Sequence, residues 1–449
     1  MSVASPSAPP PTLHLDTTHL SSHITGSTRT GAWLLSPWVA ALVGCAAVAV
    51  LALLAARWVR RHRGRSAAPP WRFRTGQGLL GVGALLLAAL TVGAAVNSYA
   101  GYLPTLAAVG RLATGDQTGD VSTADADLHA ALASSGLIAA RPRDARWRTV
   151  VVPLRDAALH IGNRDIVVAL PPGYDAQPGV RYPVVYLFNG YPGRATDWFV
   201  SGHVTQAVDA LVAARDLPFP ILVAPDVNGG YLTDSEGLDA TGGPQVQTWF
   251  AHDVVSWVDG HLRTKADRAD RVLMGMSSGG YEAVNIAFQQ QDEFGIGIGL
   301  EPYGDPGQVA DRLLGGSIAA LHAQDLNYYV PTFPLHRTIE VFLDDGGSSI
   351  RSVGRVGALA RLIADRGEPV DMRVEPHEGH TWAEAAAGLP YALAFVGRHL
   401  GEPALLQTPP PGTFPLRHRT RLSLLLSRDA QRTHTGRALP RPQSPRAPR

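Results

Sequence analysis

A serine between glycines lies in the segment DRVLMGMSSGGYEAVNIAFQ, which runs from Asp270 to Gln289. An apolar run precedes Ser277, and residues with helix-like spacing follow it. This pattern is typical of the sharp strand-to-helix turn that holds a nucleophilic serine in α/β enzymes. A chain with 47 glycines contains Gly-x-Ser-x-Gly by chance roughly 0.3 times. The surrounding segments therefore decide whether Ser277 is a nucleophile.

Two glycines flank this serine at the spacing that such a turn requires. Gly275 and Gly279 leave space in a strained turn where larger side chains would clash. Ser278 starts the predicted helix, so its backbone N–H faces the oxyanion that forms when Ser277 attacks a carbonyl carbon. The segment predicts Ser277 as a nucleophile and Ser278 as an oxyanion donor.

A second oxyanion donor is expected from the loop after an earlier strand. The segment YPVVYLFNGYPGRATDWF has a strand-like run from Val184 to Phe188, followed by Asn189-Gly190-Tyr191. Gly190 allows the backbone to turn inward, so that the Tyr191 N–H points at the same oxygen. A plain β-turn is the alternative interpretation of this segment.

The base for a serine nucleophile is expected near the end of the domain, because this architecture has the chain order serine, acid, histidine. His380 lies in EPHEGHTWAEA, directly after the strand-like VDMRVEP and before a helical run. An imidazole in that loop can reach Ser277. His377 and His380 are an alternative metal-binding pair, but no third ligand has suitable spacing, so no metal is expected.

The acid of the triad should follow the strand-like segment TIEVFLDDGGSS. Asp345 is the first choice because it starts the loop, and Asp344 is the alternative. Its role is to orient the His380 imidazole and to stabilise the imidazolium. Both aspartates also suit an ordinary turn before two glycines. Glu301 and Asp305, in LEPYGDP, are the second-choice source of the acid.

The composition excludes several other kinds of chemistry. A net charge of +1 gives no overall field that would attract nucleic acid, so no nucleic-acid partner is expected. The single cysteine, Cys45, lies in an apolar run. Disulfides, cysteine zinc sites and a cysteine nucleophile are therefore excluded from the rest of the chain. No cofactor is expected.

Two long uncharged runs precede the part of the chain that carries these motifs. They extend from Trp33 to Ala56 and from Leu79 to Tyr102. Each is long enough to cross about 30 Å of hydrocarbon. Aromatic residues lie near their ends, as at a membrane interface: Trp33, Trp38, Trp58, Tyr99 and Tyr102. A buried helical hairpin of a soluble protein is the alternative.

The segment that joins these runs predicts their orientation. Residues 57–74 hold seven arginines and no acidic residue, which places them in the cytoplasm by the positive-inside rule. Two spans then place both the N-terminus and the chain after Tyr102 outside the cell. A multi-pass cell-membrane protein with an extracytoplasmic catalytic domain is expected.

The remaining chain divides by composition into a domain and its flanking segments. From about Trp147, short β-branched runs alternate with helical stretches, which predicts an α/β domain with a mostly parallel sheet. The expected organisation is a disordered tail (1–31), a two-helix transmembrane anchor (32–102), a linker (103–145), the α/β domain (146–400) and a disordered tail rich in proline and arginine (401–449).

Three segments together resemble a known family. LPPGYDAQPGVRYPVVYLFNGYPGRATDWF, GMSSGGYEA and EGHTW are similar to the putative-esterase group of α/β-hydrolases. That group includes the antigen 85 mycolyltransferases and the feruloyl and S-formylglutathione (esterase D-like) esterases. The resemblance covers roughly residues 150–400. A two-span anchor before such a domain also resembles membrane-tethered actinobacterial esterases.

The resemblance implies an α/β-hydrolase fold and a role for each matching residue. Ser277 corresponds to the nucleophile and His380 to the base, and the Tyr191 and Ser278 N–H groups correspond to the oxyanion donors. Asn189 and Trp382 are expected to border the substrate. Many family members have His-Gly where this chain has Asn189 and Gly190. The acid often stands three residues beyond the glycine that matches Gly346, where this chain has Ser349.

Together, these patterns predict a membrane-anchored, extracytoplasmic serine esterase or acyltransferase of mycolyltransferase-like type. It would act on an ester or acyl-lipid substrate through an acyl-serine intermediate. The rival hypothesis is a catalytically weak or inactive envelope-binding protein that has kept the hydrolase fold.

Overall fold

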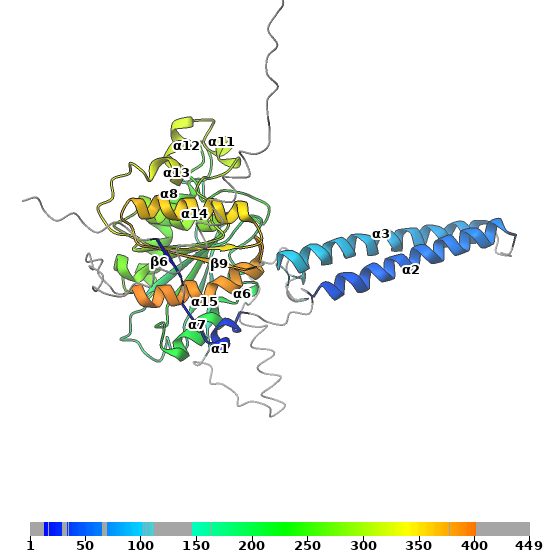
Figure 1. Ribbon diagram of the computed structural model, residues 1–449, viewed down its shortest axis with the longest axis horizontal. Coiled ribbons are helices and arrows are strands. Elements are labelled where there is room, and N and C mark those ends of the chain that lie inside the picture. The colour runs from blue at the N-terminus through cyan, green and yellow to red at the C-terminus, as the bar shows by residue number, and fades with distance from the viewer. Residues whose placement is uncertain are drawn as a thin grey trace, which may run out of the picture.

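The computed structural model describes two N-terminal helices and an α/β domain (Figure 1). The described residues are 13–16, 18–28, 34, 36–64, 70–101, 103, 106, 109–110, 146–162, 164–376 and 378–400. The predicted tail at 401–449 and most of the predicted linker at 103–145 lie outside the described residues, as do Trp33, Tyr102 and His377.

A nine-stranded sheet forms the centre of the described α/β domain, in the order β1-β9-β8-β7-β6-β4-β5-β3-β2. Its strands are β1 (Leu13–Leu15), β2 (Arg148–Pro153), β3 (Asp165–Leu170), β4 (Val184–Phe188), β5 (Ile221–Pro225), β6 (Arg271–Met276), β7 (Ile296–Leu300), β8 (Glu340–Gly346) and β9 (Val370–Glu375). All neighbouring strands are parallel except the pairs β2–β3 and β3–β5. The predicted mostly parallel sheet is confirmed.

Helices cover both faces of this sheet, which explains why its central strands are continuous apolar runs rather than alternating ones. Strands β4 and β6 are buried along their whole length. The helices of the domain are α6 (Asp197–Val200), α7 (Val204–Ala214), α8 (Val246–Trp249), α9 (Val255–His261), α10 (Ser278–Gln289), α11 (Val309–Leu313), α12 (Ile318–Gln324), α13 (Leu326–Tyr329), α14 (Ile350–Asp365) and α15 (Trp382–His399). In Figure 1, α14 lies on one side of the sheet and α7 and α15 lie on the other. The two faces bury separate apolar cores.

The segment before the first long helix differs from the expected disordered tail. Strand β1 pairs in parallel with the edge strand β9, and Leu13 lies opposite Val370. The short helix α1 (Ser22–Thr25) contacts α7 and α15, and it buries Ile24 in their apolar core. A three-residue strand of alternating type gives almost no sequence signal, so its order depends on the sheet edge that it joins.

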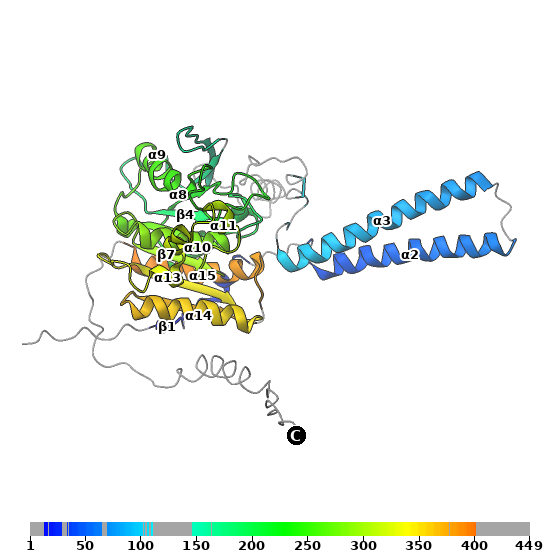
Figure 2. The ribbon, with the colours of Figure 1, turned by 90° about the horizontal axis from the view of Figure 1, so that it is seen from above.

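The two apolar runs form a pair of long helices, α2 (Pro37–His62) and α3 (Pro70–Ala100), which pack against each other. Figures 1 and 2 show this hairpin extending away from the α/β domain. Both helices are long and apolar enough to cross a membrane. Their large apolar side chains point outward: the side chains of Trp38 and Leu85, for example, are 76% and 73% exposed. The buried-hairpin alternative therefore does not describe these helices.

Candidate active site

Ser277 lies at the junction between β6 and α10. Its backbone φ of 59° and ψ of −119° are strained for a residue with a side chain. A Cβ on Gly275 would lie 1.8 Å from the carbonyl oxygen of Gly279, and one on Gly279 would lie 2.2 Å from that of Phe188. The Ser277 N–H donates to the Leu300 carbonyl oxygen at 2.9 Å. Close backbone packing thus requires both glycines of the motif.

His380 follows β9 and reaches the serine from the next loop. Its Nε2 lies 2.7 Å from the Ser277 Oγ, which is a hydrogen-bond distance. The loop before it is held in place, because the Ser348 N–H donates to the Glu378 carbonyl oxygen at 2.8 Å. Burial, and then the positive charge of Arg355, lower the pKa of His380. The imidazole is therefore neutral near pH 7 and able to accept the serine proton.

The carboxylate beside the other imidazole nitrogen belongs to Glu301. Its Oε2 lies 3.7 Å from His380 Nδ1, within ion-pair range, and its side chain is 0% exposed. Glu301 follows β7 directly, with a φ of 52°. Its N–H donates to the Asp344 carbonyl oxygen at 2.7 Å, which fixes this strained backbone next to the end of β8. The second-choice acid of the sequence analysis therefore faces the histidine.

The two aspartates that the sequence favoured as the acid have other partners. Asp345 Oδ1 accepts a hydrogen bond from Ser352 Oγ at 3.0 Å. The Asp344 carboxylate accepts two from Arg373, at 2.8 and 3.0 Å. No contact that the structure describes joins either aspartate to His380. Asp345 as the acid, with Asp344 as the alternative, thus stays a prediction that the geometry does not favour.

Ser349 stands at the position where the related esterases often carry the acid, and here it has a structural role. Its side chain caps the start of α14, where its Oγ accepts the Ser352 N–H at 3.2 Å. Ser, Thr, Asp and Asn are all preferred at this helix position, so a serine there satisfies the helix but leaves the histidine without a carboxylate. Glu301 supplies that carboxylate from the neighbouring strand end.

The loop after β4 packs directly against the nucleophile. A Cβ on Gly190 would lie 3.0 Å from both the Met276 carbonyl oxygen and the Ser277 Cβ, so a larger residue there would crowd the turn that holds Ser277. The Gly190 carbonyl oxygen accepts hydrogen bonds from the side-chain amides of Asn189 (3.1 Å) and Asn228 (3.3 Å). The loop is therefore fixed beside Ser277 by its own asparagine and by one from the loop after β5.

The predicted oxyanion donors flank this contact. Ser278 is the first residue of α10, and N–H groups in the first turn of a helix have no acceptor within that helix. Tyr191 follows Gly190, and its side chain is 40% exposed. Both residues adjoin the contact between Gly190 and Ser277, and their role as oxyanion donors stays a prediction.

Asn189 and Trp382, predicted to border the substrate, are both buried. Asn189 stabilises the loop after β4 by donating a hydrogen bond to the Gly190 carbonyl oxygen. The Trp382 ring packs edge-on against Trp198, with centroids 5.3 Å apart. Their contacts thus support the two loops that reach Ser277, and direct contact with substrate stays a prediction.

Two polar side chains that the sequence did not indicate, those of Tyr303 and Glu236, form a hydrogen-bonded network with Ser278. The Tyr303 hydroxyl contacts both carboxyl oxygens of Glu236, at 2.8 and 2.7 Å, and also interacts with the Ser278 side chain. Burial raises the pKa of Glu236 to about 8, and its φ is 47°. The only sequence signal is positional: Tyr303 lies two residues after Glu301, and Glu236 lies in the loop after β5.

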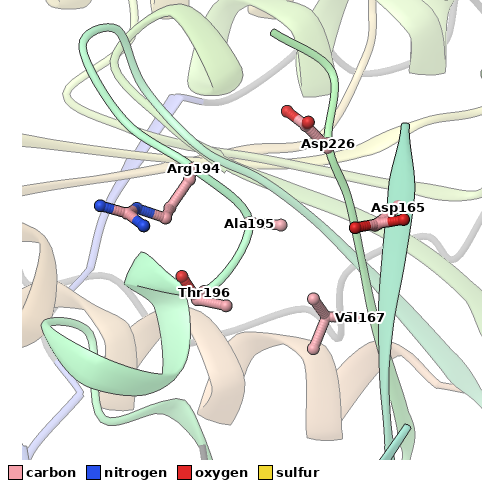
Figure 3. Close-up of a pocket in the computed structure, with 6 residues that line it drawn as sticks. All are labelled: Asp165, Val167, Arg194, Ala195, Thr196 and Asp226. Atoms are coloured by element: carbon pink, nitrogen blue, oxygen red, sulfur yellow. The ribbon is translucent and has the colours of Figure 1, made fainter. Parts of the chain in front are cut away.

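A small pocket lies between the loop after β4, the start of β3 and the end of β5 (Figure 3). It is lined by Asp165, Val167, Arg194, Ala195, Thr196 and Asp226. None of the predicted catalytic residues lines it. Within the described part of the chain, no group of three or more His, Cys, Asp or Glu residues is arranged to hold a metal ion.

The charges around the histidine predict an activity that rises with pH. Burial, and then the charges of Asp345 and Asp344, raise the pKa of Glu301. A raised carboxyl pKa keeps the acid protonated at neutral pH, and its ionised form, which orients His380, accumulates as the pH rises. His380 also makes activity rise with pH, because it accepts the serine proton only when its imidazole is neutral.

We therefore expect kcat/KM to fall below the lowered pKa of His380 and to keep rising from neutral into the alkaline range. A pH–rate profile of ester cleavage measures this. The Glu301→Gln variant is the control, because its amide has no proton to lose and its profile should be flat in the alkaline range. A wild-type profile that is also flat there would contradict an acid role for Glu301.

Comparison with known proteins agrees with this fold. Residues 161–322 match the family model described as "Putative esterase". This part of the domain is therefore similar to the putative-esterase family. A ferulic acid esterase structure shares its α/β-hydrolase fold, with a TM-score of 0.50 and 24% identity, over 57% of this chain and 99% of that one. The resemblance and the fold predicted from the sequence are thus confirmed.

Two curated relatives share part of this esterase domain. An uncharacterized protein of Corynebacterium glutamicum is 28% identical over 189 residues, which cover 39% of this chain and 44% of the relative. An endo-1,4-beta-xylanase/feruloyl esterase of Xylanibacter ruminicola is 28% identical over 116 residues, which cover 26% of this chain and 16% of the relative. The chain thus spans less than half the length of either relative.

Proposed function

We propose that this protein is a carboxylic-ester hydrolase that acts through an acyl-enzyme on Ser277. The observation that carries the proposal is the 2.7 Å contact between His380 Nε2 and Ser277 Oγ at a strained strand-to-helix turn. Nucleophile and base within hydrogen-bond reach are what covalent catalysis by serine requires. The esterase family model and the esterase fold support the same class of reaction.

The proposed first step joins the substrate to the enzyme. Ser277 Oγ attacks the ester carbonyl carbon while its proton moves to His380 Nε2, and Glu301 stabilises the imidazolium through Nδ1. The carbonyl oxygen becomes an oxyanion that the Tyr191 and Ser278 N–H groups stabilise. The ester C–O bond then breaks, and His380 gives its proton to the leaving alcohol.

The second step returns the enzyme to its starting state. Water gives a proton to His380 and attacks the acyl carbon, and the carboxylic acid leaves as the Ser277 Oγ–C bond breaks and His380 returns that proton to Ser277 Oγ. A sugar or lipid hydroxyl in place of water would transfer the acyl group to that hydroxyl, which is the acyltransferase form of the same chemistry.

We also propose that α2 and α3 span the cell membrane and that the esterase domain lies outside the cell. Strand β1, before the hairpin, and strands β2 to β9, after it, belong to one sheet, so both ends of the hairpin lie on the same side. The connector at 57–74, with its seven arginines, is then on the other side, which the positive-inside rule makes cytoplasmic. The outward-facing apolar side chains of the hairpin suit lipid rather than water.

An ester panel with product analysis tests the reaction class. We expect the purified chain to release acid from p-nitrophenyl esters of some acyl length, and the Ser277→Ala variant to release none above background. Added trehalose or glycerol distinguishes the two chemistries: an acylated sugar or glycerol identifies an acyltransferase, and free acid alone identifies a hydrolase. If folded wild-type protein cleaves no ester in the panel, the envelope-binding alternative is favoured.

A further inference from the structure

The active-site residues lie at one edge of the sheet, and the end of the hairpin that is next to the domain lies at the same edge. Ser277, Glu301 and His380 follow β6, β7 and β9, and the carboxyl ends of parallel strands lie together. Gly101, directly after α3, packs on the start of α15: a Cβ there would lie 3.2 Å from the Ala383 nitrogen and 3.4 Å from the Trp382 Cβ. Trp382 is two residues after His380.

The end of α3 is fixed locally at this contact. Asn97 Oδ1 accepts the Leu103 N–H at 2.7 Å, and Asn97 Nδ2 donates to the Leu103 carbonyl oxygen at 2.9 Å. The same amide lies 3.5 Å from the Leu34 carbonyl oxygen, which precedes α2. Asn97 therefore joins the two ends of the hairpin beside the domain.

The chain that enters the hairpin is attached to the same domain. The Asp16 N–H donates to the Met372 carbonyl oxygen at 2.9 Å, and Arg398 donates to Thr18 Oγ1 at 3.2 Å. Ile24 is buried between α7 and α15. Attachment at both ends restricts the orientation of the domain, whereas a flexible tether would leave it free to rotate.

Apolar side chains are exposed on loops at this edge. Leu232, in the loop after β5, is 75% exposed, and Tyr191, in the loop after β4, is 40% exposed. The two loops touch, because the Gly193 N–H donates to the Tyr231 carbonyl oxygen at 3.1 Å. Leu106, just beyond the hairpin, is 64% exposed. Exposed aliphatic and aromatic side chains of this kind suit the interface of a bilayer.

We propose that the docked hairpin holds the active-site edge of the domain against the membrane, so that the substrate is a lipid ester resident in that membrane. This proposal rests on the proposed esterase function and the proposed membrane spans. The acyl chain would leave the outer leaflet between the exposed loops and present its ester carbonyl to Ser277. The reaction is the one already described, with a fatty acid and a lipid alcohol as products.

Kinetics with two substrates tests the proposal. The full chain in liposomes is given either soluble p-nitrophenyl acetate or a fluorogenic long-chain acyl ester dissolved in the bilayer. Gly101→Leu should break the contact with α15, because the φ of Gly101 is +76° and its neighbours are close. A Cβ on Gly93 in α3 would meet nothing within 4 Å, so Gly93→Leu is the matched control. We expect Gly101→Leu to lower cleavage of the bilayer ester about tenfold or more and to keep soluble-ester cleavage within about twofold.

Each other outcome of this assay has a stated meaning. If Gly101→Leu cleaves the bilayer ester as fast as the wild type and Gly93→Leu do, the proposal is wrong. Equal losses on both esters also overturn it, because the contact would then serve His380 and not orientation. A wild-type protein inactive on both esters refutes the proposed function instead. Activity on the soluble ester alone refutes only this inference.

A second measurement does not depend on Gly101. A Cys45→Ala protein carries one bimane label, either at Leu232→Cys or at Asp175→Cys, and the liposomes contain brominated lipid, which quenches the label at the membrane. Asp175 follows the antiparallel strand β3 and is exposed at the opposite edge of the sheet. We expect quenching at Leu232→Cys and none at Asp175→Cys. Equal quenching at the two sites, or quenching at Asp175→Cys alone, overturns the proposed orientation.

Discussion

Ser277→Ala is expected to lower kcat for ester cleavage about 10⁴- to 10⁶-fold. The methyl group cannot attack the carbonyl carbon, and no other hydroxyl or thiol among the described contacts of His380 can replace it. The members of a serine triad act as one unit, so the loss approaches that of removing the whole triad. Steady-state kinetics on the best ester of the panel measures this effect.

The neighbouring serine provides the matched control for this experiment. Ser278 contributes its backbone N–H, which Ser278→Ala keeps, so that variant should lose only the interaction of its side chain with Tyr303. We expect a loss of less than about tenfold for it. Equal losses in the two variants, with unchanged melting temperatures, would show that Ser277 is not the nucleophile.

Glu301→Gln is expected to produce the second largest loss, about 10³- to 10⁴-fold in kcat at alkaline pH. An amide at this position cannot stabilise the imidazolium and also permits the wrong tautomer of His380. Glu301 is buried and lies 3.7 Å from His380 Nδ1, so its carboxylate is the described charge nearest to that nitrogen. Kinetics at a pH where wild-type Glu301 is ionised gives the full effect, because a protonated glutamic acid resembles glutamine.

Asp345→Asn discriminates between the two acid assignments. Its amide oxygen can still accept the hydrogen bond from Ser352, so the local structure should persist. We expect a loss of less than about tenfold for this variant. A large loss in Asp345→Asn together with a small one in Glu301→Gln would restore the assignment made from the sequence.

The strand-to-helix turn at Ser277 and the loop that carries His380 could be predicted because each has a local signal in the sequence. Gly275 and Gly279 are needed at fixed distances from Ser277 by backbone packing, and that requirement is visible in the spacing of the motif. His380 follows a strand-like run and precedes a helical one, which places it at the correct edge of a parallel sheet. The alternation of strands and helices predicted the fold in the same way.

The acid could not be chosen from sequence because the choice depends on side-chain direction at two neighbouring strand ends. Asp345 is the second-last residue of β8 and Glu301 directly follows β7, so both lie at the same edge of the parallel sheet. Two features direct the Glu301 carboxylate toward His380 and the Asp345 carboxylate away from it: the positive φ of Glu301 and the hydrogen bond between Asp345 and Ser352. Neither feature has a recognisable pattern in the sequence. The N-terminal strand was missed for a similar reason, since Leu13–Leu15 becomes ordered only on the edge of β9.

Covalent labelling with a fluorophosphonate tests the central claim most directly. The oxygen of an activated serine attacks the phosphorus of the probe and displaces fluoride, which leaves a phosphonate ester, and mass spectrometry of the digested protein identifies the modified residue. We predict one label per chain on the peptide that contains Ser277, with labelling abolished in Ser277→Ala and strongly slowed in His380→Ala. No labelling of the folded wild-type protein, or a label on another serine, would contradict the account.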